Sequence, residues 1–310
     1  MPQLISDDTD FTPTESSDDF PDVIAQLDLD TISEQTKQYA RDRVGETEES
    51  RTKLLAELED MIYEKGEVLP HRMDEAFLLR FLRARNFKLK ATYQLIVNYC
   101  RFREKHPDYY SINPLNLSHI GDQDILSVMP YKDQTNRRIM IYKIGNWKTN
   151  EIDMADILKA TYATLELGIL EPTAQILGGV VIFDLNGFNM QHACRITPKV
   201  VSVIFELIVS SIPMKTHAVH IINESWMFDT VFNLFKPLLG KRNSEMLFFH
   251  SSKMESLHKH ISPKYLPKEY GGIRPNYPYE QWFINLPKNE KIREEMLSLG
   301  FNMSENCRER

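Results

Sequence analysis

Between residues 138 and 249 the sequence alternates between short runs rich in β-branched residues and longer segments with helical periodicity. These segments occupy, in order, 138–144, 153–170, 178–185, 198–211, 218–222, 225–239 and 246–249, and a short helix is expected at 252–260. A strand, a helix and a further strand in succession are typical of βαβ units, whose strands pair in parallel. The alternation therefore predicts an α/β fold with a mostly parallel sheet flanked by helices.

A helical unit precedes this region. The spacing of apolar residues predicts helices at 33–46, 47–65, 75–85 and 88–105. Gly66 follows the end of the second helix, and Asp74 is a suitable N-cap for the third. We therefore expect an N-terminal helical domain over 33–110, an α/β domain over 111–285 and a C-terminal helical tail over 286–310.

Charge is distributed unevenly along the 310 residues. Residues 1–36 carry ten acidic residues and no Lys or Arg, whereas the whole chain has 44 acidic and 37 basic residues. The remainder thus has 34 acidic against 37 basic residues, a small positive excess. We predict that residues 1–32 form a disordered acidic tail. The tail either is simply solvated or covers a basic patch.

Several classes of protein are disfavoured by the sequence. No run reaches 18 apolar residues, and we expect no secretory leader because the N-terminus is acidic. Three widely spaced cysteines fit a reducing compartment. A sequence pI near 5.8 gives no long basic stripe for nucleic acid. GxGxxG, GxxxxGK[ST], GxSxG and HExxH are all absent, so we expect no enzyme, no cofactor, no metal site and no catalytic residue.

Two of the predicted helices are unusually apolar. The segment VVSVIFELIVSSI (200–212) is apolar around nearly its whole circumference, so it lies either between two protein layers or against a ligand cavity. The segment 225–239 places its apolar residues in one arc and is rich in phenylalanine. This helix either faces the core or closes an apolar pocket and also contacts a bilayer.

Six strings occur in an order that is specific to one family. They are FLLRFLRARNF (77–87), FDLNGF (183–188), ITPKV (196–200), HIINE (220–224), FKPLL (235–239) and LPKEYGG (266–272). Over about residues 50–285 the chain resembles the CRAL-TRIO (Sec14-like) lipid-binding family, in particular its branch of tocopherol- and retinaldehyde-binding proteins. The acidic tail lies outside this resemblance.

The resemblance implies a Sec14-like sheet with an apolar cavity, closed by a mobile gate helix that corresponds to 225–239. The gate residues it implies are Phe228, Val231, Phe232 and Phe235. The ligand-pocket residues it implies are Leu158, Thr161, Tyr162, Leu165, Phe183, Ile196, Ile204, Leu207, Ile208 and Val219. Two pocket positions that carry hydroxyls in the tocopherol carrier are Thr161 and Leu165 here.

The resemblance also implies a phosphoinositide-binding site at Arg85, Lys215 and Arg242. A fourth basic position of that site in the tocopherol carrier is Met246 in this chain.

The expected function is therefore that of a cytosolic lipid-transfer protein. It would bind one small hydrophobic ligand, tocopherol- or retinoid-like, and exchange it at phosphoinositide-containing membranes. We expect a monomer that is cytoplasmic and transiently peripheral to membranes, with no nucleic-acid partner. The alternative is a phosphoinositide-sensing recruitment module that carries no cargo.

Overall fold

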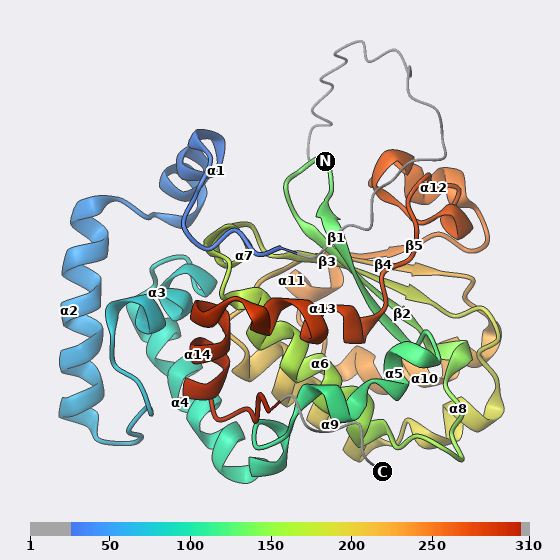
Figure 1. Cartoon of the computed structure of the whole chain (residues 1–310), viewed down its shortest axis with the longest axis horizontal. Helices are drawn as coiled ribbons and strands as arrows, with labels where there is room; N and C mark the ends of the chain where they lie inside the picture. The colour runs from blue at the N-terminus through green and yellow to red at the C-terminus, as the bar shows by residue number, and fades with distance from the viewer. Residues whose placement is uncertain (1–25, 305–310) are drawn as a thin grey trace.

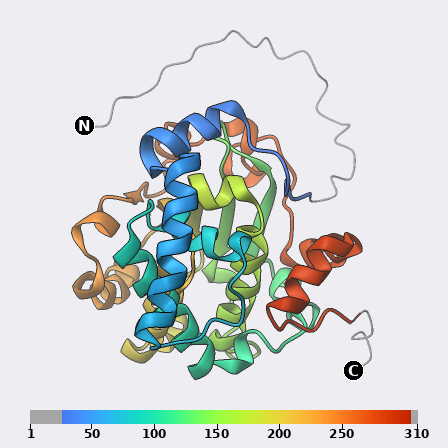
Figure 2. The same cartoon turned by 90° about the vertical axis from the view of Figure 1, so that its left-hand side faces the viewer.

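The computed structural model describes residues 26–304, apart from the side chains of Lys241 and Arg242. Its N-terminal part is helical, as predicted. The elements are α1 (Glu34–Tyr39), η1 (Ala40–Val44), α2 (Glu48–Lys65), α3 (Glu75–Ala84) and α4 (Leu89–Lys105). Asp74 caps α3 by accepting a hydrogen bond from Phe77 N. This helical unit lies at one end of the molecule, with α2 along its outer side (Figures 1 and 2).

The second part is built on a five-stranded sheet of order β1-β2-β3-β4-β5. The strands are β1 (Leu126–Lys132), β2 (Arg138–Lys143), β3 (Gly179–Asp184), β4 (Thr216–Ile222) and β5 (Leu247–Phe249). β1 pairs with β2 antiparallel, and all other pairs are parallel. The α/β prediction is confirmed, but β1 was not predicted. Pro130 interrupts its strand pattern, which is tolerated because β1 is an edge strand.

The remaining elements connect and cover the strands. They are η2 (Pro107–Tyr109), η3 (Pro114–Leu117), α5 (His119–Asp122), η4 (Ile144–Asn146), α6 (Met154–Ile169), α7 (Pro172–Leu177), α8 (Met190–Arg195), α9 (Pro198–Ile204), η5 (Phe205–Ser211), α10 (Trp226–Phe235), η6 (Lys236–Leu238), α11 (Lys241–Ser244), α12 (Met254–His258), η7 (Pro263–Tyr265), η8 (Lys268–Tyr270), α13 (Tyr279–Asn285), η9 (Leu286–Lys288) and α14 (Glu290–Ser298). The predicted helix at 225–239 ends as α10 at Phe235, since Pro237 opens a 3₁₀ turn.

The sheet has two faces that differ in what covers them. We call the face that carries Tyr142, Phe183, Ile221 and Phe249 the front face, because these residues align across β2, β3, β4 and β5. The helices α6, α9, α10 and the π-helical turn η5 cover it. The back face packs against α12 and the segment that follows, through Leu257, Ile261, Leu266 and Tyr270. Along β3, residues of the back face are buried and those of the front face only partly so.

The two predicted tails are partly packed. Residues 26–32 lie against the core through Leu27, Leu29 and Ile32, because these apolar residues alternate with the acidic ones. Asp30 forms an ion pair with Lys291 of α14 at 2.6 Å. Residues 26–32 of the predicted tail thus pack against the body of the protein; the rest of the predicted tail, 1–25, lies outside the described residues.

The C-terminal segment is helical, as predicted, but it is not a separate appendage. Met296, Leu299 and Phe301 are buried in the main core. Asn302 N donates to Ile112 O at 2.9 Å. Residues 305–310 lie outside the described residues. Within 26–304, no helix is both long and apolar enough to cross a bilayer.

Candidate functional site: two cavities on one face of the sheet

An apolar cavity of about 200 Å³ lies between the front face of the sheet and the helices α6, α9 and α10. We call it the gate cavity. Its lining residues are Tyr142, Ile144, Met154, Ile157, Leu158, Thr161, Phe183, Leu185, Phe188, Ile196, Ile204, Ile208, Val219, Ile221, Phe228, Val231, Phe232, Phe235, Leu239 and Leu247. No charged side chain is among them, so only an apolar ligand or part of one fits without loss of hydration energy.

The structure brings most of the expected pocket residues together. Seven of the ten line the gate cavity, namely Leu158, Thr161, Phe183, Ile196, Ile204, Ile208 and Val219. They come from five elements and one loop, because every helix on the front face turns one apolar side toward the sheet. Val181 and Phe183 of β3 are only partly buried because each of them borders a cavity.

Three expected pocket residues lie elsewhere. The Tyr162 side chain points away from the gate cavity, and its hydroxyl accepts a hydrogen bond from Arg103 Nη1 at 3.0 Å. Leu207 is fully buried, on the side of η5 that packs into the main core with α4. Leu165, one turn beyond Thr161 on α6, lines a different cavity. Residues on successive helical turns thus face different spaces, which the sequence pattern does not resolve.

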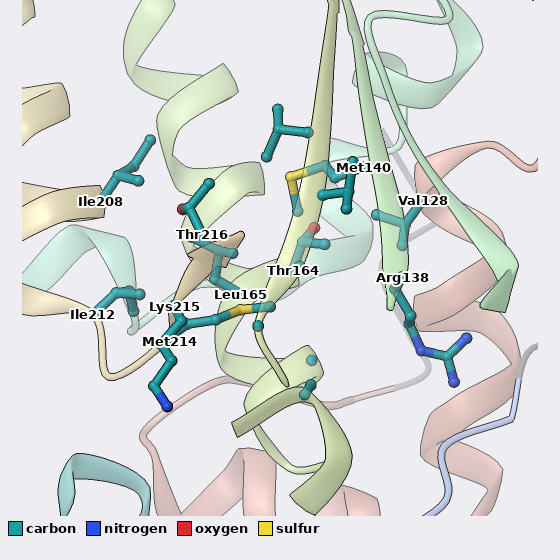
Figure 3. Close-up of a pocket in the computed structure, with 16 residues that line it drawn as sticks. Val128, Arg138, Met140, Thr164, Leu165, Ile208, Ile212, Met214, Lys215 and Thr216 are labelled. Atoms are coloured by element: carbon teal, nitrogen blue, oxygen red, sulfur yellow. The ribbon is translucent and has the colours of Figure 1, made fainter. Parts of the chain in front are cut away.

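That second cavity lies farther along the same face of the sheet and has a volume of about 60 Å³. It is lined mainly by apolar groups of β2, β3, α6 and η5, including Met140, Val181 and Leu165. Figure 3 shows it, with Ile208 and Ile212 on one side and Val128 and Arg138 on the other. Its two charged lining residues both bond to protein groups: Arg138 pairs with Glu171 at 3.0 Å, and Lys215 Nζ donates to Ile176 O at 3.2 Å.

Ile208 is the residue that the two cavities share, since its side chain lines both. It belongs to η5, which begins where the regular helix α9 ends and which has π-helical hydrogen bonding. Such wide turns are uncommon and recur at functional sites. The apolar helix predicted at 198–211 therefore lies between a protein layer on the Leu207 side and empty space on the Ile208 side.

The polar atoms at the wall of the gate cavity bond to each other. The Tyr142 hydroxyl and Thr161 Oγ1 lie 2.7 Å apart, and Thr161 Oγ1 also donates to Ile157 O at 2.9 Å. Burial raises the pKa of Tyr142, so its hydroxyl stays protonated. Thr161, one of the two positions that carry hydroxyls in the tocopherol carrier, thus stabilises the wall and is not left unpaired for a ligand.

This pair gives a measurable prediction. Thr161→Val should lower the free energy of unfolding by about 1–3 kcal/mol, because it leaves the buried Tyr142 hydroxyl without a partner. Combining it with Tyr142→Phe should restore most of the loss, since both polar groups are then gone. Urea denaturation of both single variants and the double variant measures this coupling. If the double variant loses as much free energy of unfolding as the two single variants lose in sum, the two hydroxyls do not depend on each other.

The gate helix α10 covers the gate cavity with one side and is exposed on the other. Phe228, Val231, Phe232 and Phe235, the four expected gate residues, all line the cavity. The opposite side exposes Trp226, 69% accessible, beside the polar Asp229, Thr230 and Asn233, while Leu234 and, in the following turn η6, Leu238 are exposed as well. Large apolar side chains at such exposure lose the stabilisation that burial would give them, so this surface is suited to a further apolar contact.

Edge strand β5 supports the gate helix from the side. The ring of Phe249 lies 5.4 Å from that of Phe232 and 6.5 Å from that of Phe228. Leu247, two residues earlier, lines the gate cavity. Neither residue was predicted as part of the site. The run MLFF has a strand-like composition, but nothing in it shows which ring meets which helix.

The expected phosphoinositide residues are placed differently from one another. Arg85 follows α3, and its Nη2 lies 3.3 Å from Val209 O at the outer side of η5. Lys215 follows η5, and its Nζ donates to Ile176 O at 3.2 Å. Arg242 belongs to α11, but its side chain is not among those described. Arg85 thus contacts η5, whereas Lys215 lies in the segment after it and contacts the end of α7.

Other basic residues of the same motif have structural roles. Arg80 is buried and pairs with Glu295 at 2.8 Å, and Arg83 pairs with Glu46 at 2.5 Å. Both are therefore unavailable to a membrane surface. In the described part of the chain, no group of three or more His, Cys, Asp or Glu is arranged to hold a metal ion.

Comparison with known proteins gives a consistent result. The family model for the CRAL/TRIO domain matches residues 122–272, and the model for a Pinta-like UBA domain matches 47–120. The mouse protein named alpha-tocopherol transfer protein-like is 30% identical over 274 residues, which cover 88% of this chain and 78% of that protein. Human Clavesin-2 is 28% identical, over 84% of this chain and 80% of its own.

Two further matches extend the comparison. Mouse Clavesin-1 is 29% identical over 81% of this chain and 72% of its own. Among solved structures, the crystal structure of Sfh5 superposes with a TM-score of 0.44 at 12% identity, over 76% of this chain and 92% of Sfh5.

Proposed function

The chain belongs to the CRAL/TRIO family of lipid-binding and lipid-transfer proteins, and on that premise we propose that it carries one hydrophobic molecule in the gate cavity and exchanges it at membranes. It would do so as a cytoplasmic monomer that meets membranes only transiently. The observation that carries the proposal is an apolar cavity closed by a helix that also exposes Trp226 and Leu234.

The volume of the gate cavity supports a moving gate. Pockets for small molecules usually measure roughly 300–1,000 Å³, whereas this one measures about 200 Å³. A tocopherol- or retinoid-sized ligand would therefore have to displace side chains or the helix itself. Since α10 has one side on the cavity and the other exposed, it is the element that can move with the smallest loss of packing.

We further propose that the two cavities are parts of one elongated ligand site. Both lie on the front face of the sheet, and Ile208 lines both. A rotation of that one side chain, together with the flexible Met140 or Met214, would connect them. A linear ligand would then place its widest part under the gate helix and its far end near Leu165.

Membrane contact would use the exposed apolar side chains of α10 and η6 together with basic residues. Trp226, Leu234 and Leu238 would enter the interface, while Arg85, Lys215 and Arg242 would attract anionic headgroups such as phosphoinositides. Binding to that interface would favour the open gate only to the extent that the open form binds it more tightly.

A variant with Arg85, Lys215 and Arg242 all changed to Ala tests this assignment. Transfer to vesicles that contain phosphoinositide should slow by about tenfold or more, because each basic residue near an anionic surface contributes about 1 kcal/mol. Transfer to neutral vesicles should not change. A stopped-flow transfer assay with both vesicle types measures the difference, and equal slowing on both would count against a headgroup site.

The alternative of a recruitment module without cargo makes a different prediction. It requires vesicle binding but no internal ligand, and an adaptor would have no need for the gate cavity. Incubation with a panel of tocopherol, retinal, sterol and phospholipid separates the two functions. Uptake of any one at about one molecule per chain supports the carrier, whereas vesicle binding with no uptake supports the module.

A further inference from the structure

Three histidines meet on the back face of the sheet, behind the strands that support the gate helix. His220 of β4 and His250, directly after β5, are joined by a hydrogen bond from ring to ring, Nδ1 to Nε2, at 2.8 Å. The ring centroid of His260 lies 5.2 Å from that of His220 and 5.6 Å from that of His250. We call these three residues the histidine cluster. It plays no part in the two cavities.

The central bond of the cluster exists only while at least one ring is neutral. In an imidazole–imidazole hydrogen bond one nitrogen donates and the other accepts, and a protonated ring can only donate. His220 is 2% exposed and His250 is 4% exposed, so water cannot take the place of the lost acceptor. Protonation of both rings would turn the bond into a contact between two buried like charges.

The groups around the cluster offer little compensation for such charge. His250 Nδ1 bonds to Ser256 Oγ of α12 at 2.8 Å, which is a neutral partner. Glu224 offsets part of any charge on His250; its Oε1 accepts hydrogen bonds from the backbone N–H and the hydroxyl of Ser251, and its buried Oε2 has no hydrogen-bond partner among the described residues. His217 on β4 and Lys259 beside His260 add further positive charge.

The surroundings set the direction of the pKa shifts. Burial, followed by the neighbouring histidines, lowers the pKa of His220 from 6.5 to about 3. Burial also lowers the pKa values of His250 and His260. In an opened form these rings would return toward the ordinary value near 6.5. The closed form is therefore fully stable above about pH 6.5, and it loses stability as the pH falls from there toward the lowered values.

Strand β5 connects the cluster to the gate. It is only three residues long, and its neighbours face opposite ways: Phe248 stacks on His220 at 5.2 Å, whereas Phe249 touches the gate helix through Phe232. His250 N donates to Ile221 O at 3.0 Å and so holds the end of the strand. Loss of the cluster would release the strand and with it one support of the gate helix.

We propose that the histidine cluster is a proton-sensitive latch, which opens the gate helix and promotes cargo release when the protein meets an acidic environment. This inference rests on the proposed carrier function. A suitable environment includes an anionic membrane surface, because a surface potential of about −30 to −50 mV concentrates protons by about three- to sevenfold. The latch and the basic residues would then respond to the same membrane.

The test uses the full chain loaded with N-phenyl-1-naphthylamine, an apolar fluorescent probe that stays uncharged between pH 5.5 and 7.5. When the pH falls from 7.5 to 5.5, protonation of His220 alone should accelerate release to neutral phosphatidylcholine vesicles by about tenfold. Protonation of His250 and His260 should add smaller factors. His220→Asn keeps a hydrogen-bonding group near the position of Nδ1 but does not titrate, and it should remove about that tenfold factor.

Two further variants keep the test decisive. His260→Phe preserves the ring packing against Phe248, and it should remove a smaller part of the pH dependence even if His220→Asn does not fold. His119→Gln, in α5, is the matched control and should leave the dependence intact. Probe release that is independent of pH, or that keeps its full dependence in both cluster variants, would overturn the latch.

A measurement without ligand separates this inference from the carrier function. Hydrogen exchange at the amides of Phe248 and Phe249, corrected for its intrinsic pH dependence, should accelerate at pH 5.5 in the wild type and less in His260→Phe. If the probe fails to bind at any pH, the carrier proposal fails, and the exchange data still decide whether the latch opens. Unchanged corrected exchange would contradict the latch even in a protein that binds the probe.

Discussion

Ile208→Asp is expected to abolish cargo binding, with an affinity loss of more than about 100-fold. The side chain lines both cavities, and the gate cavity contains no charged group that could pair with a new carboxylate. An isolated charge in such a site either prevents the apolar ligand from entering or draws water into its place. Fluorescence titration with an apolar probe measures the loss, and circular dichroism confirms that the variant is folded.

Ile208→Ala is the matched variant at the same position. It removes the wall between the two cavities without adding charge, so it should still bind ligand and should gain relative affinity for longer chains. Each methylene that finds room contributes about 0.8 kcal/mol, or close to fourfold in affinity. A folded Ile208→Asp protein that still binds its ligand would refute the position of the pocket. Unchanged chain-length preference in Ile208→Ala would refute only the connection between the cavities.

Arg103→Met should lower the free energy of unfolding by about 3–5 kcal/mol. The guanidinium of Arg103 is buried, bonds to the Tyr162 hydroxyl at 3.0 Å and to Leu299 O at 2.7 Å, and lies 3.9 Å over the ring of Tyr110. It thereby joins α4 to α6 and to the C-terminal segment. Removing it leaves a buried hydroxyl and a buried carbonyl without their donor. Chemical denaturation measures the loss.

Tyr162→Phe provides the comparison for Arg103→Met. It deletes only the acceptor hydroxyl, so it should cost about 1–3 kcal/mol. Because Tyr162 faces Arg103 and not the gate cavity, both variants should keep the cargo affinity of the wild type in the folded fraction. A large loss of affinity in Tyr162→Phe without a loss of stability would return this residue to the ligand site.

The sequence was informative wherever a pattern repeats along one element. The alternation of strands and helices predicts the parallel strands β2 to β5, and the apolar arc of 225–239 predicts the helix α10 and the side it buries. For the apolar segment 198–211, two surroundings were expected as alternatives, a protein layer and a cavity. The structure shows both, protein at Leu207 and a cavity at Ile208. These features were predictable because burial acts on each element separately.

Features that depend on contacts between distant elements were not predictable in this way. Tyr162 and Leu165 are apolar or aromatic residues of the same helix as Thr161, but one meets Arg103 and the other meets a second cavity. β1 was not predicted because Pro130 interrupts the strand pattern of this edge strand. The histidine cluster is built from residues 30 and 10 positions apart, so no local pattern brings its members together.

The packed residues 26–32 were missed for a related reason. The prediction for that stretch was based on its net charge. It therefore gave no weight to Leu27, Leu29 and Ile32, which pack against the body of the protein. Charge composition predicts solvation of a segment only where no apolar residues recur within it.

Above all, we propose that the chain carries a hydrophobic molecule in the gate cavity and in the second cavity that adjoins it at Ile208. Native mass spectrometry of gently purified protein, followed by organic extraction and identification of the lipid, tests it most directly. The account predicts one bound hydrophobic molecule per chain, which is lost in Ile208→Asp. A protein that is empty as purified and takes up none of the tocopherol, retinal, sterol and phospholipid panel would contradict it.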